Sequence, residues 1–258
     1  RAESQLILGA GASAKPDYLG SDDYEATALP MLRYSWSGEM AAQPATGYKT
    51  SFGLIDLQAG FPDGVDVGVA RIATPGRNFT LRLGGGYRFG RDAGDNDALH
   101  GMGDIDGQVL ARVTLASEPA DPRRLGTSYG LRYEADISGE TDGETLTAFA
   151  DHALALSPKT TLTLSGNLRW ADDDQMQSYF GVSSRQAARS GNARFDAGSG
   201  FSDAGLAARL DWSFAEHWIL SGRVGYTRLL GDAADSPLVD DEGSANQFVL
   251  STAVAYRF

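Results

Sequence analysis

Apolar and polar residues alternate with a period of two along most of the chain. Between Thr161 and Trp170, for example, every second residue is apolar or glycine, and the residues between them are polar. Successive side chains of a β-strand point to opposite sides, so this pattern predicts a strand with one apolar and one polar face. No stretch of a dozen residues repeats its apolar positions convincingly at helical spacing. The pattern therefore predicts an all-β chain.

The alternation predicts twelve strands, with ten as the alternative count. The expected strands are residues 5–14, 24–36, 46–58, 65–73, 79–90, 104–117, 125–138, 143–157, 160–171, 200–214, 217–230 and 245–258. The weakest assignments are the segment from Ile55 to Ile72, where Pro62-Asp63-Gly64 can form a turn or a bulge, and the mixed strand around Phe149.

Two arrangements bury such apolar faces: a soluble sandwich, which turns them inward, and a membrane barrel, which turns them toward lipid. Strands of about ten residues are longer than is usual in soluble sheets and match a tilted bilayer crossing. Aromatic residues stand at the ends of the apolar stripes, where the interfacial girdles of a barrel lie: Trp36, Phe79, Tyr87, Phe89, Trp170, Trp212, Phe214, Trp218, Tyr226 and Phe258. We therefore predict a single-domain, closed antiparallel transmembrane β-barrel over residues 1–258.

Connection lengths support the barrel. Starting from an inner-side N-terminus, the connections at one end are mostly short, namely 37–45, 74–78, 118–124, 157–159 and 215–216. Those at the other end are long, namely 15–23, 91–103, 171–199 and 231–244. Short periplasmic turns and long extracellular loops are typical of bacterial outer-membrane barrels.

Composition excludes several other classes of protein. The chain carries 22 Lys and Arg against 34 Asp and Glu, a net charge of −12, with no basic stripe that would indicate nucleic-acid binding. It has no Cys, which excludes a disulfide scaffold, a zinc–cysteine site and a cysteine nucleophile. Its apolar runs fall far short of the roughly 20 residues of a membrane helix. Because residues 1–4 lack signal-peptide character, we expect any secretory signal to have been removed or never present.

Several segments together resemble the MipA/OmpV family of outer-membrane proteins. They are Pro16–Tyr24 with Leu29-Pro30, Tyr87–Asp92 with Gly101–Asp106, Tyr179–Ser183, Gln186–Gly191, Leu229–Pro237 and the ending Tyr256-Arg257-Phe258. These blocks cover essentially the whole chain, and only Gln43 to Gly64 fits the family pattern loosely.

The resemblance implies a β-barrel of the bacterial outer membrane. For the family it also implies proposed roles as a scaffold for murein hydrolases and synthases, and in some members in permeability or adhesion. We therefore expect a non-enzymatic structural or scaffolding protein, surrounded by outer-membrane lipid and lipopolysaccharide and inserted by the outer-membrane assembly machinery. The alternative is a narrow channel for small polar solutes.

The last strand carries a candidate assembly signal. Phe258, Tyr256 and Val254 share one apolar face, and the aromatic residue stands at the end of the printed sequence. This arrangement resembles the signal by which the assembly machinery captures a last strand, although an ordinary lipid-facing edge has the same composition.

Charged residues on the polar faces are expected to point into the lumen. They are Arg33, Lys49, Arg82, Arg88, Asp104, Asp106, Arg112, Arg132, Glu134, Asp136, Asp151, Arg169, Arg209, Asp211, Arg223 and Arg257. Both signs are present, so ion pairs can fill a narrow interior, or rows of opposite charge can face each other across a water path. Since a barrel of twelve strands is far smaller than a general porin, we favour a filled or narrow lumen.

The long connection 171–199 is expected to act as a constriction. It contains Tyr179, Phe180, Arg185, Arg189 and Arg194, an aromatic and basic mixture in an acidic protein. A loop of this length is usually functional or folded back. We expect its arginines to meet lumen carboxylates such as Asp104, Asp106 or Asp211.

No chemistry-bearing motif indicates catalysis or a bound cofactor. His100, His152 and His217 have no evident nucleophile or acid partner in the sequence. The acidic outer loops lack the spacing of a known calcium loop, so we interpret them as solvated charge and expect no metal site. Gly84-Gly85-Gly86 lies within a strand and lacks the features of a phosphate-binding loop.

Overall fold

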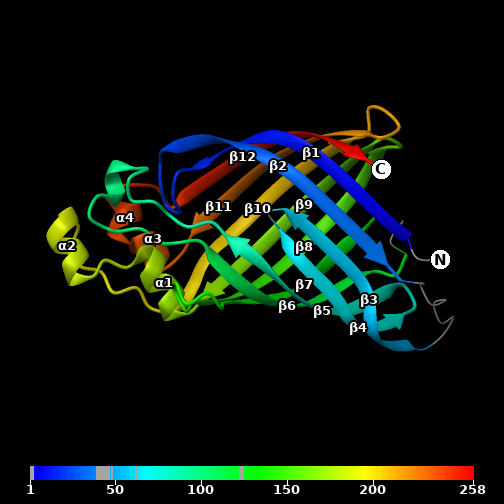
Figure 1. Ribbon diagram of the computed structural model, residues 1–258, viewed down its shortest axis with the longest axis horizontal. Helices are drawn as coiled ribbons and strands as arrows, with labels where there is room; N and C mark the ends of the chain where they lie inside the picture. Colours follow the sequence, from blue (N-terminus) through cyan, green and yellow to red (C-terminus); the bar gives the residue numbers. More distant parts are fainter. Residues whose placement is uncertain (1–2, 39–46, 48, 62, 122–124) are drawn as a thin grey trace.

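The structure, a computed structural model, describes residues 3–38, 47, 49–61, 63–121 and 125–258. Within these residues, twelve antiparallel strands form one closed barrel in which neighbours in sequence pair and β1 pairs with β12 (Figure 1). The strands are β1 (Glu3–Pro16), β2 (Tyr24–Ser37), β3 (Lys49–Phe61), β4 (Gly64–Thr74), β5 (Arg77–Arg88), β6 (Gln108–Pro119), β7 (Thr127–Asp136), β8 (Glu144–Ser157), β9 (Thr160–Ala171), β10 (Gly200–Trp212), β11 (Trp218–Leu229) and β12 (Asn246–Arg257).

The closed barrel confirms the twelve-strand prediction, and the count of ten is wrong. The doubtful segment around Ile55 to Ile72 forms a hairpin, because the pairing of β3 with β4 continues to Gly60 opposite Gly64. Gly64 has a φ of 94°, which favours glycine, and it brings the chain back toward β5. Pro62 lies outside the described residues.

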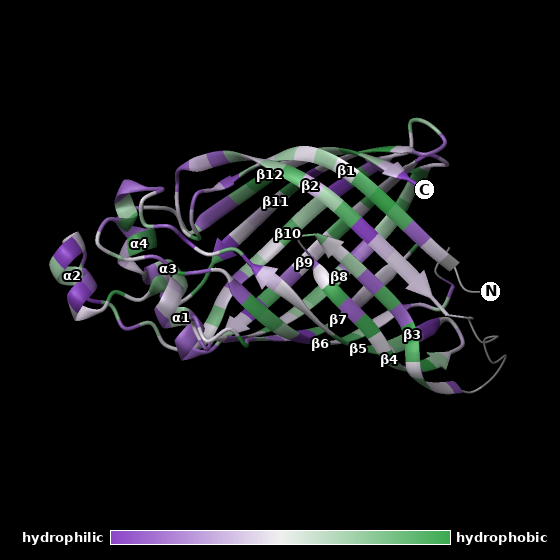
Figure 2. Ribbon diagram, in the orientation of Figure 1, coloured by the Kyte–Doolittle hydropathy of each residue, from purple (hydrophilic) through white to green (hydrophobic). Residues whose placement is uncertain are grey.

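The alternation places apolar side chains on the outside of the barrel. Leu206 of β10 and Leu250 of β12 are 68% and 63% exposed, whereas Ala253 and Ala255 on the lumen side of β12 are buried. Hydrophobic and hydrophilic residues alternate along the strands, and the segment around α2 is mostly hydrophilic (Figure 2). An apolar outer face and a polar inner face suit a barrel whose solvent is lipid.

The two ends of the barrel differ. The chain begins and ends at the same end of the barrel, which we call the inner end, and the fully described turns there are short (Figure 1). The other end, the outer end, carries the short helices η1 (Asp97–Leu99), α1 (Asp173–Phe180), α2 (Ser184–Ser190), α3 (Asp232–Asp235) and α4 (Pro237–Asp240). No helix in the described part of the chain has the length and hydropathy needed to cross a membrane.

The alternation did not predict these helices, since each has eight residues or fewer. The sequence feature that could have predicted them is the capping residue at the start of a helix. Asp172 caps α1 by accepting a hydrogen bond from the Gln175 N–H (2.9 Å), and Ser183 forms a capping box with Gln186 at the start of α2.

The wall has a break beside β2, which we call the notch. β2 pairs with β1 from Tyr24 to Ser37 but with β3 only from Leu32 to Ser37. On the other side, β5 loses its β4 partner after Gly85. In the described residues, the β3–β4 hairpin therefore stops short of the outer end and leaves residues 24–31 of β2 without a strand on that side.

Candidate functional site

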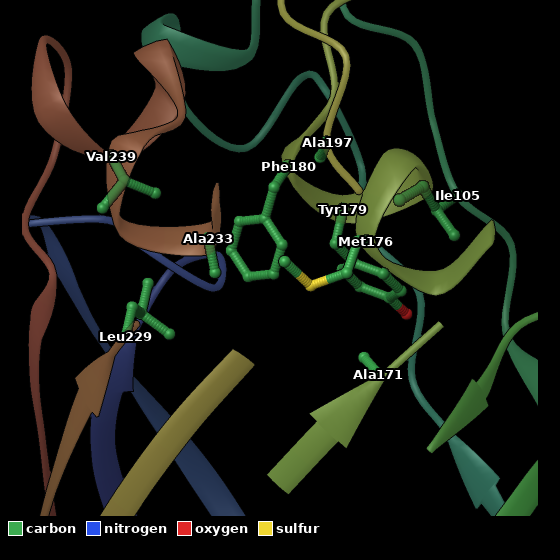
Figure 3. Packing of buried hydrophobic residues seen from close by; sticks show 9 residues of the cluster. All are labelled: Ile105, Ala171, Met176, Tyr179, Phe180, Ala197, Leu229, Ala233 and Val239. Carbon is green, nitrogen blue, oxygen red and sulfur yellow. The ribbon is translucent and has the colours of Figure 1, made fainter. Parts of the chain in front are cut away.

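The outer end is filled by packed loop residues. We call residues 17–23, 89–107, 172–199 and 230–245 the outer cap. Met176 and Phe180 of α1 face Ala233 of α3 and Leu229 at the end of β11 (Figure 3). The rest of this buried cluster is Ile105, Ala171, Tyr179, Ala197 and Val239. Tight packing of this kind excludes water, so the cap is a folded part of the protein.

A second buried cluster joins the other cap loops. It consists of Tyr18, Leu99, Met102, Val182 and Leu238. The Tyr18 hydroxyl donates a hydrogen bond to the Leu238 carbonyl (2.9 Å), and Ser236 Oγ donates to the Phe180 carbonyl (2.6 Å). Burial, followed by the nearby charge of Asp22, raises the pKa of Tyr18 to about 12. Tyr18 is therefore neutral at physiological pH and remains a donor.

The cap is also attached to the lumen wall. Arg88 Nη1 donates to Gln175 Oε1 of α1 (3.0 Å), and Gln108 Nε2 donates to the Tyr179 hydroxyl (3.3 Å). Arg91 Nη1 donates to the Tyr179 carbonyl (3.2 Å), and burial lowers the pKa of this guanidinium. These contacts hold α1 against the inward faces of β5 and β6.

The residues expected to form a constriction lie in two different environments. Tyr179 and Phe180 are buried in the cap. Arg185, Arg189 and Arg194, in contrast, are exposed, and the expectation that they meet lumen carboxylates is wrong. α2 begins only after the bridge between Val182 and Phe195, so it lies beyond the mouth, and Arg194 pairs instead with Asp196 (2.8 Å).

Asp104 and Asp106 also differ from expectation. The strand predicted to begin at residue 104 begins at Gln108, so both carboxylates are exposed residues of the outer cap and do not face the lumen. The cause is local. Asp104 Oδ1 accepts a hydrogen bond from the Ala93 N–H (2.8 Å), and the Asp106 N–H donates to Glu140 (2.8 Å), which ends the strand pairing here.

Charged side chains cross-link the lumen wall on one side of the barrel. Asp56 of β3 pairs with Arg71 of β4 and with Arg82 of β5 (Nε to Oδ1, 3.3 Å). Arg82 reaches Glu118 of β6 as well (Nη1 to Oε1, 3.1 Å). Only 6% of Arg82 is exposed, so this four-charge cluster is a buried network that joins four strands.

A second, three-charge cluster lies nearby. Arg112 of β6 pairs with Asp66 of β4 (3.0 Å) and with Glu134 of β7 (2.9 Å). Its Nη1 also donates to the Asp63 carbonyl at the tip of the β3–β4 hairpin (2.9 Å). The four-charge cluster is neutral, whereas the three-charge cluster has one negative charge in excess. Together they cross-link the lumen side of β3 to β7.

The opposite wall is less fully paired. Arg169 Nη1 lies 3.7 Å from Asp203 Oδ2, and Arg209 Nε lies 2.9 Å from Asp211 Oδ2. Arg132, on β7 beside the three-charge cluster, lies 5.4 Å from the Phe149 ring centroid and has no carboxylate partner among the described residues. The same holds for Arg223 of β11, for which the described part of the chain provides no ion pair or hydrogen bond.

Arg223 lines a cavity of about 810 Å³, which we call the lumen cavity. It reaches the inner end at Pro158. Its charged lining comprises five basic residues and two acidic ones, namely Arg33, Lys159, Arg209, Arg223, Arg257, Asp63 and Asp211. The cavity is thus cationic in a protein with a net charge of −12.

The remaining candidates lie apart from the lumen. Phe258 is 65% exposed and packs edge-on against Tyr256, with ring centroids 4.8 Å apart. His100 belongs to the outer cap, His152 contacts Thr127 on the outward face of β8, and His217 stacks on Tyr256 at the inner end. Among the described residues, no group of three or more His, Asp or Glu side chains is arranged to hold a metal ion.

Comparison with known proteins assigns this barrel. A family model described as MltA-interacting protein MipA matches residues 8–258. The chain belongs to the MipA family. The MltA-interacting protein of Escherichia coli K12 is 25% identical over 254 residues, covering 81% of this chain and 94% of that protein. Outer membrane protein OmpV of Vibrio cholerae is 28% identical over 201 residues, covering 71% and 75%.

The MipA-family assignment confirms the resemblance seen in the sequence and places the protein in the bacterial outer membrane. Outer membrane protein Omp26La of Vibrio anguillarum is similar over 99% of this chain and 88% of its own length, at 26% identity. Among solved structures, OprB of Pseudomonas putida aligns with a TM-score of 0.48 at 10% identity, covering 100% of this chain and 94% of that chain.

Proposed function

We propose that this MipA-family barrel is a non-enzymatic structural protein whose inner end docks periplasmic enzymes that degrade or synthesise murein. The observation that carries the proposal is the difference between the two ends. The outer mouth is filled by the cap, whereas the inner end presents short, exposed turns toward the periplasm, where murein lies. The name of the Escherichia coli relative, MltA-interacting protein, supports a murein enzyme as partner.

The described inner turns offer exposed residues at three places around the rim. Pro75 and Gly76 lie between β4 and β5, Pro158 and Lys159 between β8 and β9, and Glu216 between β10 and β11. Each turn is small, so a stable complex requires contacts with several of them at once. The longer turns predicted at 37–45 and 118–124 contain residues outside the described part of the chain.

Site-specific photo-cross-linking tests the proposal. A benzophenone amino acid is placed at Pro75, Lys159 or Ala215 in the barrel folded in detergent, and a soluble form of MltA is added. The matched control carries the same group at the exposed Ala188 of α2, at the outer end. We expect adducts from the inner positions and none from Ala188. Equal labelling at both ends, or no adduct from any inner position, would contradict the docking role.

A narrow channel is the second candidate, and the lumen cavity is the observation that favours it, because the cavity reaches the inner end. Conduction would require the outer cap to open. The lipid, lipopolysaccharide and assembly-machinery contacts of the outward face, including the signal at Phe258, Tyr256 and Val254, remain predictions. Removing Phe258 is expected to slow membrane assembly more than it lowers stability, and normal assembly of that truncation would contradict the signal.

A further inference from the structure

The lumen cavity does not stop at the inner face of the wall. Its lining includes four consecutive residues of β2, Leu29–Leu32, together with Phe61 of β3. Leu32 and Phe61 form the last pair of the β2–β3 ladder, beside the notch, and both side chains lie on the outward face of the wall. The cavity therefore continues from the charged lumen to the lipid-facing surface.

The notch end of the cavity is apolar. Leu32 and Phe61 are 44% and 47% exposed on the outward face of the barrel. Pro30 lies at the unpaired edge and has no backbone N–H to leave unsatisfied there. These side chains suit a hydrocarbon chain better than a hydrated solute.

The lumen end of the cavity carries uncompensated positive charge. Arg209 and Arg223 are direct cross-strand neighbours on β10 and β11. Like charges directly opposite each other destabilise a strand pair unless something compensates them. Asp211 pairs with Arg209, but Arg223 has no partner among the described residues. Arg33 and Arg257 also line the cavity and lie on either side of Ile7 of β1, and Arg33 Nη2 is 3.9 Å from Asp63 Oδ2. With five basic and two acidic residues, the lining keeps a net positive charge.

We propose that the lumen cavity binds a single-chain anionic amphiphile, with its head group among Arg223, Arg209 and Arg33 and its hydrocarbon chain in the notch. A small polar anion would use the arginines but leave the apolar end of the cavity empty. A neutral lipid would leave the arginine pair uncompensated. The volume of about 810 Å³ lies within the range of small-molecule binding sites.

Fluorescence titration with a dansyl-labelled undecanoic acid tests the proposal on the full chain folded in detergent. We expect a saturable rise in emission. The methyl ester of the same probe, which has no charge, is expected to bind at least about tenfold more weakly, because it loses the charge-assisted contacts. Acetate and inorganic phosphate, which have no chain, are expected not to displace the acid.

Three substitutions locate the head group. Arg223→Gln is expected to weaken binding of the acid about tenfold and to leave binding of the ester unchanged. Arg223→Lys keeps the charge and is expected to restore most of the affinity. The control Arg194→Gln removes an exposed outer-cap arginine and is expected to bind like the wild type. Heat-modifiable migration on gels confirms that each variant is folded.

The absence of native Cys allows the chain to be located by single-cysteine labelling. A bimane at Met31, beside the notch, is expected to be quenched by stearic acid that carries a nitroxide near its methyl end. A bimane at Ala135, on the outward face of β7, reports quenching by probe dissolved in the micelle. Equal quenching at both sites, equal binding of acid and ester, or displacement by phosphate at matched concentration would each overturn the proposal.

Discussion

At the scale of single residues, the ion pairs of this protein differ in how deeply they are buried. Arg82 is buried and bridges two carboxylates, whereas Arg194 forms an ion pair in which both side chains are more than half exposed. A buried pair that loses one partner leaves a carboxylate uncompensated in a region of low dielectric. An exposed pair contributes little, because water and salt screen it.

This contrast predicts two different mutational effects. Arg82→Ala is expected to lower the free energy of unfolding by about 3 kcal/mol. Glu118 loses its cation, and Asp56 loses one of its two cations and keeps only Arg71. Arg194→Ala is expected to change it by less than about 0.5 kcal/mol. Urea unfolding of the barrel in lipid vesicles measures both. Similar losses in the two variants would mean that the four-charge cluster does not behave as a buried network.

Tyr18 predicts a pH effect at the same scale. Its pKa is about 12 in the folded cap against an ordinary value of 10.0, so folding favours the neutral hydroxyl. The stability from this group is fully present below pH 10.0 and is lost as the pH rises toward about 12. Wild type is thus expected to have a higher melting temperature than Tyr18→Phe below pH 10.0, and the gap is expected to close by about pH 12. A gap that stays constant over this range would contradict the assignment.

At the scale of elements, the β3–β4 hairpin decides where the notch begins. Gly64 sits at its tip with a φ of 94°, and a Cβ there would lie 2.1 Å from the Gly85 carbonyl oxygen. Gly76 has nearly the same φ, 96°, but its Cβ would meet nothing within 4 Å. A substitution at Gly76 therefore introduces backbone strain alone, whereas a substitution at Gly64 introduces both backbone strain and steric overlap.

Alanine substitutions at these glycines are expected to differ in size. Gly76→Ala is expected to cost about 1 kcal/mol from the positive φ alone. Gly64→Ala should cost at least about 2 kcal/mol, because the hairpin must also move away from β5. Unfolding of both variants in vesicles measures the difference. Equal losses would show that the tip of the hairpin moves freely, which would contradict a notch of fixed shape.

Some of the strands and helices could be predicted from the sequence alone, and others could not. Strands such as Thr160–Ala171 were predictable within a residue or two, because each residue faces either lipid or the lumen and the alternation records that choice. The start of β6 was not, since Asp104 and Asp106 continue the alternation but bond to loop groups. Nor were the cap helices or the notch predictable. Both depend on contacts between segments that are far apart in the sequence, such as the contact of Met176 with Ala233. The local pattern of apolar and polar residues does not predict such contacts.

At the scale of the whole molecule, the cap and the lumen together determine whether the barrel conducts ions. The outer mouth is filled by the cluster around Met176 and Phe180, while the lumen cavity behind it carries five basic residues against two acidic ones. A buried apolar seal gives way when charge is placed inside it, because the charge must regain water. A pore that opens onto this lumen should then favour anions.

Single-channel recording in planar bilayers tests this connection between cap and lumen. The wild-type barrel is expected to be silent or nearly so, with insertion verified by labelling of an engineered cysteine. The double variant Met176→Asp/Phe180→Asp is expected to conduct, with a reversal potential in a salt gradient that indicates anion preference. Ala188→Asp on the exposed α2 serves as control and should remain silent, since α2 lies beyond the seal. Steady wild-type currents as large as those of the double variant would favour the channel over the docking barrel, and cation preference in the open variant would mean that the arginines of the lumen cavity do not control the ion path.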